Sequence, residues 1–221
     1  MKNNPLDTRN APAFIAIEGA IGVGKSSLAK KIARSLGHTL VQEDVSSNPF
    51  LEAFYSSQAS SALALELQFL LTRSQQWNDL SQDKLASQHL VSDFILQKDP
   101  IFAKQTLSEN EYALYLQYYQ KIRGTLRSPD LVIYLQAPLD ALRARIKRRG
   151  ISYEKNISHA YLQGLSDAYT DFFHHYDASP LLIVNSSEIN PVDNDADYQQ
   201  LLTSICSTHS GRHYLNPLAN L

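Results

Sequence analysis

The residues best suited to chemistry in this chain form a glycine-rich loop near its start. The segment 19–26 reads GAIGVGKS and fits the pattern G-x-x-x-x-G-K-[ST] without a mismatch. It follows an apolar stretch, Ala13 to Glu18, that predicts a buried strand, and a helix is expected from Ser27 onward. Glycines let consecutive backbone N–H groups point at one anion, and the following helix directs its positive end there. The pattern predicts a site for a nucleoside triphosphate.

Two side chains are expected to complete this site. Lys25 would neutralise the β- and γ-phosphates, and the Ser26 hydroxyl would bind Mg²⁺. An ordinary Gly-rich turn between a strand and a helix is the alternative, but such a turn does not require this Lys and Ser. The residues predicted to contact the nucleotide are Gly19, Ala20, Ile21, Gly22, Val23, Gly24, Lys25, Ser26 and Ser27.

Two acidic side chains end further predicted strands. Glu43 lies near the end of the segment 38–44, and Asp93 lies near the end of 89–94. In parallel α/β sheets, ligands bind at the carboxyl ends of the strands, so both acids are expected to face the glycine-rich loop. Phosphoryl transfer to a hydroxyl uses one carboxylate that accepts the proton and oxygen ligands that hold Mg²⁺. Glu43 and Asp93 are suited to these two tasks.

The elements that position these residues alternate along the chain. Strands are predicted over 13–18, 38–44, 89–94, 129–136 and 180–187. Helices are predicted from Ser27, over 46–55, 61–80 and 108–123, from Pro138 through 143–150, and over 159–176. Such alternation predicts an α/β fold of the P-loop NTPase kind, with a five-stranded parallel sheet and helices on both faces. We expect a flexible N-terminal tail over 1–12, a kinase-like domain over 13–206 and a C-terminal tail over 207–221, to which the sequence assigns no element.

Composition excludes several other classes. The 221 residues carry a net charge of −2, which argues against nucleic acid as a partner because no basic stripe is available. The single cysteine, Cys206, excludes an intramolecular disulfide and a cysteine zinc cluster. The polar residues 1–12 lack the apolar region of a signal peptide, and no apolar run reaches the roughly 18 residues of a membrane span. We therefore expect a soluble, cytoplasmic protein.

Four stretches of the chain resemble the deoxynucleoside kinase family. They are IEGAIGVGKSSLAKKIA, QEDVSSNPFLEAFY, the helix ending in FLLTR, and RRGISYEKNISHAYLQGL followed by Tyr169 and Phe172. The glycine-rich loop alone is shared by many unrelated NTPases, whereas E-x-V-x-x-N-P-F-L-E-x-F-Y is far more specific. The resemblance runs from about Phe14 to Val184. It implies ATP- and Mg²⁺-dependent phosphorylation of a deoxynucleoside 5′-hydroxyl.

The resemblance also implies roles for individual residues. Glu43 matches the family's catalytic base, and Asp93 matches an acid that contributes to Mg²⁺ binding. Tyr55 matches a tyrosine that touches the sugar 3′-hydroxyl, although a helix residue of this kind is equally suited to a core. Arg73 and Asp99 match a pair above the base, with a structural salt bridge as the alternative.

The chain departs from the family pattern at several positions. An arginine that supplies positive charge to the reaction is replaced by Phe94, which shifts that task to Lys98 or to a lid residue. The family places a glutamine seven residues before Arg73, where this chain has Glu66. Gln68 lies two positions away, about 200° around the helix, so both cannot face the site. The register favours Glu66.

The basic segment 143–156 resembles the family's lid, which closes arginines over the phosphates. Arg145 and Arg149 match lid arginines, Ile151 replaces another, and Glu154 matches a second contact to the 3′-hydroxyl. A basic helix end that interacts with the helix dipole is the simpler alternative. Closure of a lid expels water and strengthens charge interactions around the phosphates.

Two other functions remain open from the sequence. A nucleoside monophosphate kinase resembling thymidylate kinase shares the fold and the lid, but it leaves NPFLEAFY unexplained. A nucleotide-binding regulatory protein with weak kinase activity is favoured by Phe94 and Ile151, and opposed by intact Lys25, Ser26 and Glu43. Family members are commonly dimers, so we expect a homodimer, with the helix 108–123 as a candidate surface.

Overall fold

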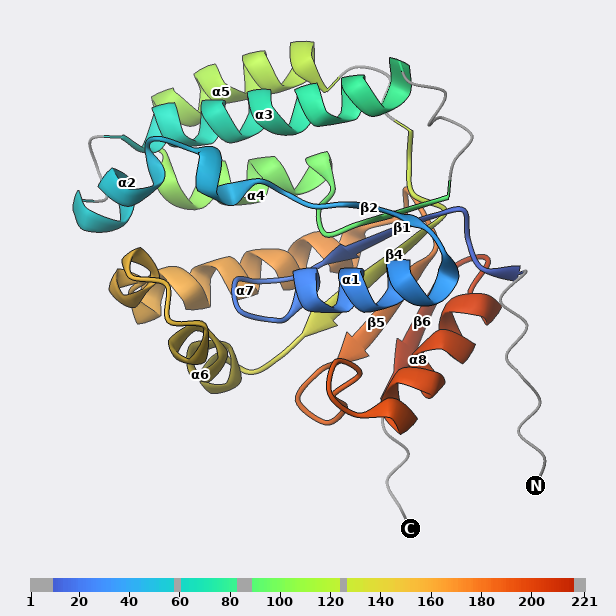
Figure 1. Ribbon diagram of the computed structural model, residues 1–221. Coiled ribbons are helices and arrows are strands. Elements are labelled where there is room, and N and C mark those ends of the chain that lie inside the picture. Colours follow the sequence, from blue (N-terminus) through green and yellow to red (C-terminus); the bar gives the residue numbers. More distant parts are fainter. Residues whose placement is uncertain (1–9, 58–60, 83–88, 124–126, 217–221) are drawn as a thin grey trace, which may run out of the picture.

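A computed structural model describes residues 10–57, 61–82, 89–123 and 127–216 (Figure 1). Residues 1–9 of the predicted N-terminal tail and residues 217–221 of the predicted C-terminal tail lie outside this part of the chain. No helix within it is both long enough and apolar enough to cross a membrane.

One parallel sheet forms the centre of the molecule, with the strand order β2-β3-β1-β4-β5-β6. The strands are β1 (Phe14–Glu18), β2 (Thr39–Val41), β3 (Leu90–Ser92), β4 (Leu131–Gln136), β5 (Leu181–Asn185) and β6 (Arg212–Leu215). The predicted parallel α/β fold is confirmed, but the predicted number of five strands is wrong. The sixth strand was missed because β6 is an edge strand whose residues are exposed except for Leu215, so its sequence shows no apolar run.

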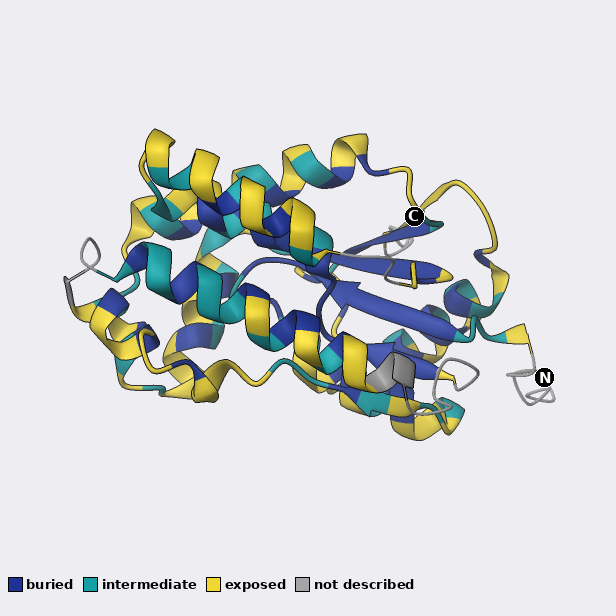
Figure 2. Cartoon of the chain, turned by 90° about the horizontal axis from the view of Figure 1, so that it is seen from above, coloured by how far each residue is buried: buried dark blue, intermediate teal, exposed yellow. Residues whose placement is uncertain are grey.

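Helices cover both faces of the sheet (Figures 1 and 2). The α-helices are α1 (Lys25–Leu36), α2 (Leu51–Ser57), α3 (Ala62–Gln82), α4 (Asp99–Thr106), α5 (Glu109–Ile122), α6 (Leu139–Arg149), α7 (His159–His175) and α8 (Asp195–Ser207). Short 3₁₀ helices are η2 (Val45–Ser47), η4 (Leu96–Lys98) and η5 (Tyr153–Asn156). The predicted helix over 46–55 is instead η2 followed by α2. The sequence did not predict α4 and α8.

The side chains of the strands divide the core into two layers. Along β1, Ile15 and Ile17 pack into a cluster with α1 and α8, whereas Phe14 and Ala16 pack into a cluster with α7. This alternation is the period of two that a strand imposes on its side chains. Because both faces are covered, all five residues of β1 are buried. The sheet therefore holds the loop after β1 in a fixed place relative to the ends of β2 and β3.

Helices α3 and α5 form an outer layer beyond α4 (Figure 1). A third cluster, which includes Leu70, Leu96 and Tyr115, fills the space between these helices. Figure 2 shows the helices striped with buried and exposed residues, while the central strands are almost wholly buried. The side of α3 that faces inward carries the residues discussed below.

Candidate active site

A cavity of about 350 Å³ opens at the carboxyl ends of β1, β2 and β3. The glycine-rich loop forms one wall, α2 and α3 form a second, and the segment around η5 forms a third. The predicted site residues on its walls are Ile21, Gly22, Lys25, Ser26, Glu43, Tyr55, Glu66, Arg73, Asp93, Arg149 and Glu154. The fold thus brings together side chains that are up to about 130 residues apart in the sequence.

The glycine-rich loop has a conformation that its glycines make possible. Gly22 has a φ of +84° and Gly24 a φ of +107°, in a region that other residues rarely adopt. A Cβ atom on Gly22 would lie 2.8 Å from the Leu142 carbonyl oxygen, and one on Gly19 would lie 2.5 Å from the Leu135 carbonyl oxygen. The loop therefore fits against α6 and β4 only without side chains at these positions.

Lys25 begins α1 and folds back over this loop. Its Nζ donates hydrogen bonds to the carbonyl oxygens of Gly19, at 2.7 Å, and Ala20, at 3.4 Å. Burial and the nearby charge of Lys98 lower the pKa of Lys25 to about 8. An anion in the loop would offer this ammonium group a stronger partner than two neutral carbonyl groups.

Glu43 lies at the centre of a charge network beside the loop. It accepts hydrogen bonds from Arg73 Nε, at 2.6 Å, from Arg73 Nη2, and from Lys98 Nζ, at 2.9 Å. Burial acts to raise the pKa of Glu43, but the charges of Arg73 and Lys98 outweigh it and lower the pKa to about 2. Glu43 is therefore ionised throughout the neutral pH range.

The ends of β2 and β3 are tied together by Asp93. One carboxylate oxygen of Asp93 accepts a hydrogen bond of 2.8 Å from the backbone N–H of Glu43. Asp93 and Ser26 both line the cavity, so a carboxylate and a hydroxyl stand beside the glycine-rich loop. Oxygen donors of this kind suit Mg²⁺, which keeps several waters and is bound by one or two protein groups together with phosphates.

Arg73 connects Glu43 to a second buried carboxylate. Its Nη1 donates a 2.6 Å hydrogen bond to Asp99, which is fully buried at the start of α4. The guanidinium also lies 4.6 Å from the centre of the Phe69 ring. These contacts hold Arg73 in one orientation against the cavity. Asp99 does not itself line the cavity and reaches it only through Arg73.

Two charged residues near Glu43 were assigned no definite role from the sequence. Lys98 is only 1% exposed, and its Nζ lies 3.9 Å from Glu18 in addition to its bond with Glu43. Glu18 accepts hydrogen bonds from the backbone N–H groups of Gly19 and Ile95 and from the Tyr169 hydroxyl. One carboxylate thus joins the glycine-rich loop, the segment after β3 and α7. The sequence could have indicated both residues by their positions, because Glu18 ends β1 and Lys98 directly precedes α4.

Phe94, the departure from the family's arginine, points into the core. It is fully buried, and its ring centre lies 5.7 Å from that of Trp77. The Lys98 ammonium lies 5.8 Å from the same ring. A positive charge is therefore present at the cavity wall, and it is carried by a residue four positions further along the chain.

Glu66 and Gln68 project from different faces of α3, because residues two positions apart are separated by about 200° around a helix. Glu66 lines the cavity, where one carboxyl oxygen accepts a 3.0 Å hydrogen bond from the Thr106 hydroxyl. Gln68 instead donates to Thr72 on α3. Burial raises the pKa of Glu66 to about 8, although the charge of Arg73 acts in the opposite direction.

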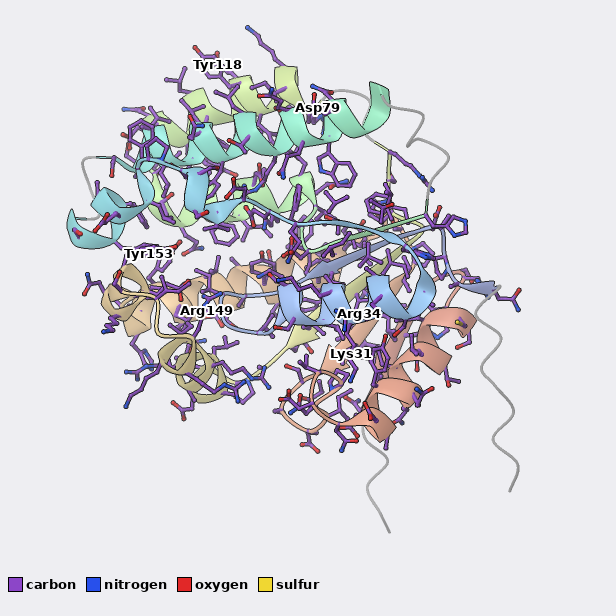
Figure 3. All side chains as sticks on the ribbon, in the orientation of Figure 1. Lys31, Arg34, Asp79, Tyr118, Arg149 and Tyr153 are labelled. Atoms are coloured by element: carbon purple, nitrogen blue, oxygen red, sulfur yellow. The ribbon has the colours of Figure 1, made fainter. Side chains whose placement is uncertain are left out.

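Of the basic segment over 143–156, residues between 149 and 154 line one end of the cavity (Arg149 and Tyr153 are labelled in Figure 3). Arg149 Nε donates a 2.9 Å hydrogen bond to Glu154, and its Nη2 contacts the other carboxylate oxygen. The Tyr153 ring stacks on Tyr55 with centres 5.7 Å apart. Arg145 lies elsewhere. It donates hydrogen bonds to the carbonyl oxygens of Val23 and Ser186, so it connects the glycine-rich loop to the turn after β5 and does not line this cavity.

A parallel sheet with a glycine-rich loop after β1, and a carboxylate and two lysines around one cavity, defines a P-loop kinase. The family model described as "Deoxynucleoside kinase" matches residues 15–209. This chain belongs to the deoxynucleoside kinase family, and the resemblance inferred from its motifs is confirmed. The match favours a deoxynucleoside kinase over both the monophosphate kinase and the regulatory protein considered above.

Known proteins are similar over nearly their whole length. The deoxyguanosine kinase of Bacillus subtilis is 33% identical over 201 residues, which cover 89% of this chain and 97% of that protein. The deoxyadenosine kinase of Dictyostelium discoideum is 29% identical, with 92% and 82% covered. The solved structure of deoxyadenosine kinase from M. mycoides with bound dCTP has a TM-score of 0.76 at 28% identity, with 87% and 98% covered.

Proposed function

We propose that this kinase transfers the γ-phosphoryl group of ATP to the 5′-hydroxyl of a deoxynucleoside and so forms the 5′-monophosphate. The observation that carries the proposal is the cavity in which Glu43 faces Lys25 and Ser26 of the glycine-rich loop. The loop receives the triphosphate, and the region between α2 and α3 receives the nucleoside. The three relatives named above are deoxyguanosine or deoxyadenosine kinases, which makes purine deoxynucleosides the first substrates to test.

Lys25 and the loop backbone hold the phosphates in this mechanism. The backbone N–H groups and the positive end of α1 surround the phosphate oxygens, and Lys25 moves from its carbonyl partners to them. Ser26 and Asp93 would hold Mg²⁺, whose charge neutralises the phosphates when it is bound. Among the described residues no group of three or more His, Cys, Asp or Glu side chains could hold a metal ion by itself, and a metal held jointly with phosphates does not need one.

Glu43 accepts the proton of the 5′-hydroxyl as the phosphoryl group arrives. It is ionised in the free enzyme, and Arg73 and Lys98 fix the direction of its carboxylate. The 5′-oxygen must lie within hydrogen-bond reach of this carboxylate. Lys98, which bonds to Glu43 and lines the same cavity, places a positive charge beside the oxygens that gain charge in the transition state.

Replacing Lys98 by Met tests this assignment. The methionine keeps an unbranched apolar stem but removes the charge, so kcat should fall about 10²-fold while ATP binding changes little. Steady-state kinetics with saturating ATP measure the change. Lys104→Met, on the exposed side of α4, is the matched control. Wild-type turnover in Lys98→Met would mean that Lys98 only stabilises the fold.

The sugar and the lid complete the proposed complex. Tyr55 and Glu154 are proposed to contact the 3′-hydroxyl. Burial raises the pKa of Tyr55 well above its usual value, so its hydroxyl stays neutral. We propose that the kinase domain begins at residue 13 and extends past the expected end at 206 to include β6. Residues 143–156 are its proposed lid, from which Arg149 turns from Glu154 toward the phosphates. Arg145 is proposed to act on the phosphates through the loop that it braces.

The activity is tested by incubating the purified protein with ATP, Mg²⁺ and each of the four deoxynucleosides, with dTMP as a further acceptor. Formation of ADP and of a monophosphate from at least one deoxynucleoside supports the proposal. Product from dTMP alone, or ATP binding without any product, would overturn it.

A homodimer is the assembly that we propose. Exposed apolar side chains lie on the outer layer of α3 and α5, where Leu71, Leu114 and Tyr118 are 52%, 41% and 47% exposed (Tyr118 is labelled on α5 in Figure 3). A second copy would bury them. Sedimentation equilibrium should give a mass of twice the 24.8 kDa of one chain, and the Leu114→Glu variant should have the mass of a single chain.

We place the enzyme in the cytoplasm, where ATP is available, and its net charge of −2 favours no nucleic-acid partner.

A further inference from the structure

Glu66 is a buried carboxyl group that faces the nucleoside end of the cavity with few partners. It is 2% exposed, and its hydrogen bond in the structure comes from the Thr106 hydroxyl. Among the residues that the structure describes, no Lys or Arg forms an ion pair with it. Burial raises the pKa of Glu66, because no bonded cation in the described part of the chain offsets the loss of solvent around its carboxyl group. A buried carboxyl group of this kind is incomplete until a ligand supplies hydrogen-bond donors.

The chemistry of a carboxylate restricts which base can supply them. Its two oxygens only accept hydrogen bonds, and they match two N–H donors that lie side by side. Guanine has such a pair, the N1–H and the 2-amino group. Adenine and cytosine each present one amino group next to a ring nitrogen that accepts, and thymine presents one N–H between two carbonyl groups. An amide such as glutamine would match adenine or cytosine, because it combines one donor group with one acceptor.

We propose that Glu66 makes this enzyme selective for guanine deoxynucleosides by accepting hydrogen bonds from N1–H and from the 2-amino group. The inference rests on the proposed kinase function and names the base within it. With its raised pKa, Glu66 is mainly protonated at neutral pH before a base binds, and two donors from guanine favour its ionised form, so binding releases a proton.

The rest of the cavity fits the same base. Arg73 lies seven residues further along α3, on the same face of the helix. Three of its five N–H groups are used by Glu43 and Asp99, and the remaining two can donate to an acceptor such as the guanine O6. Phe69 and Phe102 also line the cavity and provide flat apolar surfaces for the faces of the base.

The test compares several substrates with the wild-type enzyme and then replaces the proposed hydrogen-bond acceptor, Glu66. For the wild type, kcat/KM should be highest for deoxyguanosine, and lower by roughly 10- to 100-fold for deoxyinosine, which lacks the 2-amino group. Glu66→Gln should lower kcat/KM for deoxyguanosine by about 10²-fold and raise it for deoxyadenosine, so that the preference reverses. Glu52→Gln, an exposed acid on α2, should leave the preference unchanged.

The readout is the ratio of two substrates on one protein preparation, so partial unfolding of a variant cancels. Efficient turnover of deoxyadenosine or deoxycytidine with little of deoxyguanosine would overturn the inference and leave the kinase function standing. An unchanged ratio in Glu66→Gln would do the same. Failure to phosphorylate any deoxynucleoside would overturn the kinase function and this inference with it.

Discussion

Replacing Glu43 by Gln is expected to lower kcat by roughly 10²–10⁴-fold, because the amide cannot accept the proton of the 5′-hydroxyl. The shape of the side chain is nearly retained, but the amide has one acceptor oxygen, so only one of Arg73 and Lys98, which bond to different oxygens of Glu43, keeps its partner. The affinity for ATP should change little, since Glu43 lies on the side of the cavity proposed to receive the nucleoside. Single-turnover kinetics with saturating ATP and nucleoside measure the chemical step.

Two further measurements separate this role from a structural one. Isothermal titration should give the same ATP affinity for Glu43→Gln as for the wild type, which shows that the loop is intact. Glu188→Gln removes an exposed carboxyl group in the turn after β5 and should have wild-type turnover. Unchanged turnover in Glu43→Gln would remove Glu43 from the mechanism.

Replacing Lys25 by Ala is expected to act on nucleotide binding itself. The alanine removes a positive charge from the phosphates, so the affinity for ATP with Mg²⁺ should fall about 10- to 100-fold. The value of kcat/KM should fall by roughly 10³-fold, since the same charge stabilises the transition state. Titration calorimetry gives the first quantity and initial rates give the second.

The control for Lys25 lies on the same helix. Lys30 is exposed on α1, five residues further along, and Lys30→Ala should bind ATP like the wild type. Within the described part of the chain, the hydrogen bonds of Lys25 go to two carbonyl groups of the loop, so its loss should lower thermal stability little. Equal ATP affinity in Lys25→Ala and the wild type would contradict the placement of the triphosphate.

The parts of the site that could be predicted are those that short segments define. The glycine-rich loop is contiguous in the sequence, and Glu43 and Asp93 follow predicted strands, so the rule for parallel sheets brings them together. The helical period placed Glu66 and Arg73 on one face of α3. Each of these predictions needed only local periodicity and one general property of the fold.

The remaining features depend on packing between distant segments. The contact of Lys98 with both Glu43 and Glu18 needs the ends of three strands in place, and no pattern near Lys98 predicts it. The sequence shows that Phe94 replaces the family's arginine, but the position of its ring in the core beside Trp77 is known only from the structure. The strand β6 was missed for a simpler reason, because an exposed edge strand lacks an apolar signal.

Arg73 contacts both the proposed catalytic base and the part of the cavity proposed to bind the nucleobase. Its guanidinium bonds to the proposed catalytic base on one side and to Asp99 on the other, and it lies on the helix face that carries Glu66. Any shift of Arg73 that accommodates a different base therefore reaches Glu43 directly, through the two hydrogen bonds that join these residues. With the proposed roles of Glu43 and Glu66, we expect this contact to couple substrate choice to reaction rate. Redesign of α3 for a new base will change the turnover number as well as the Michaelis constant.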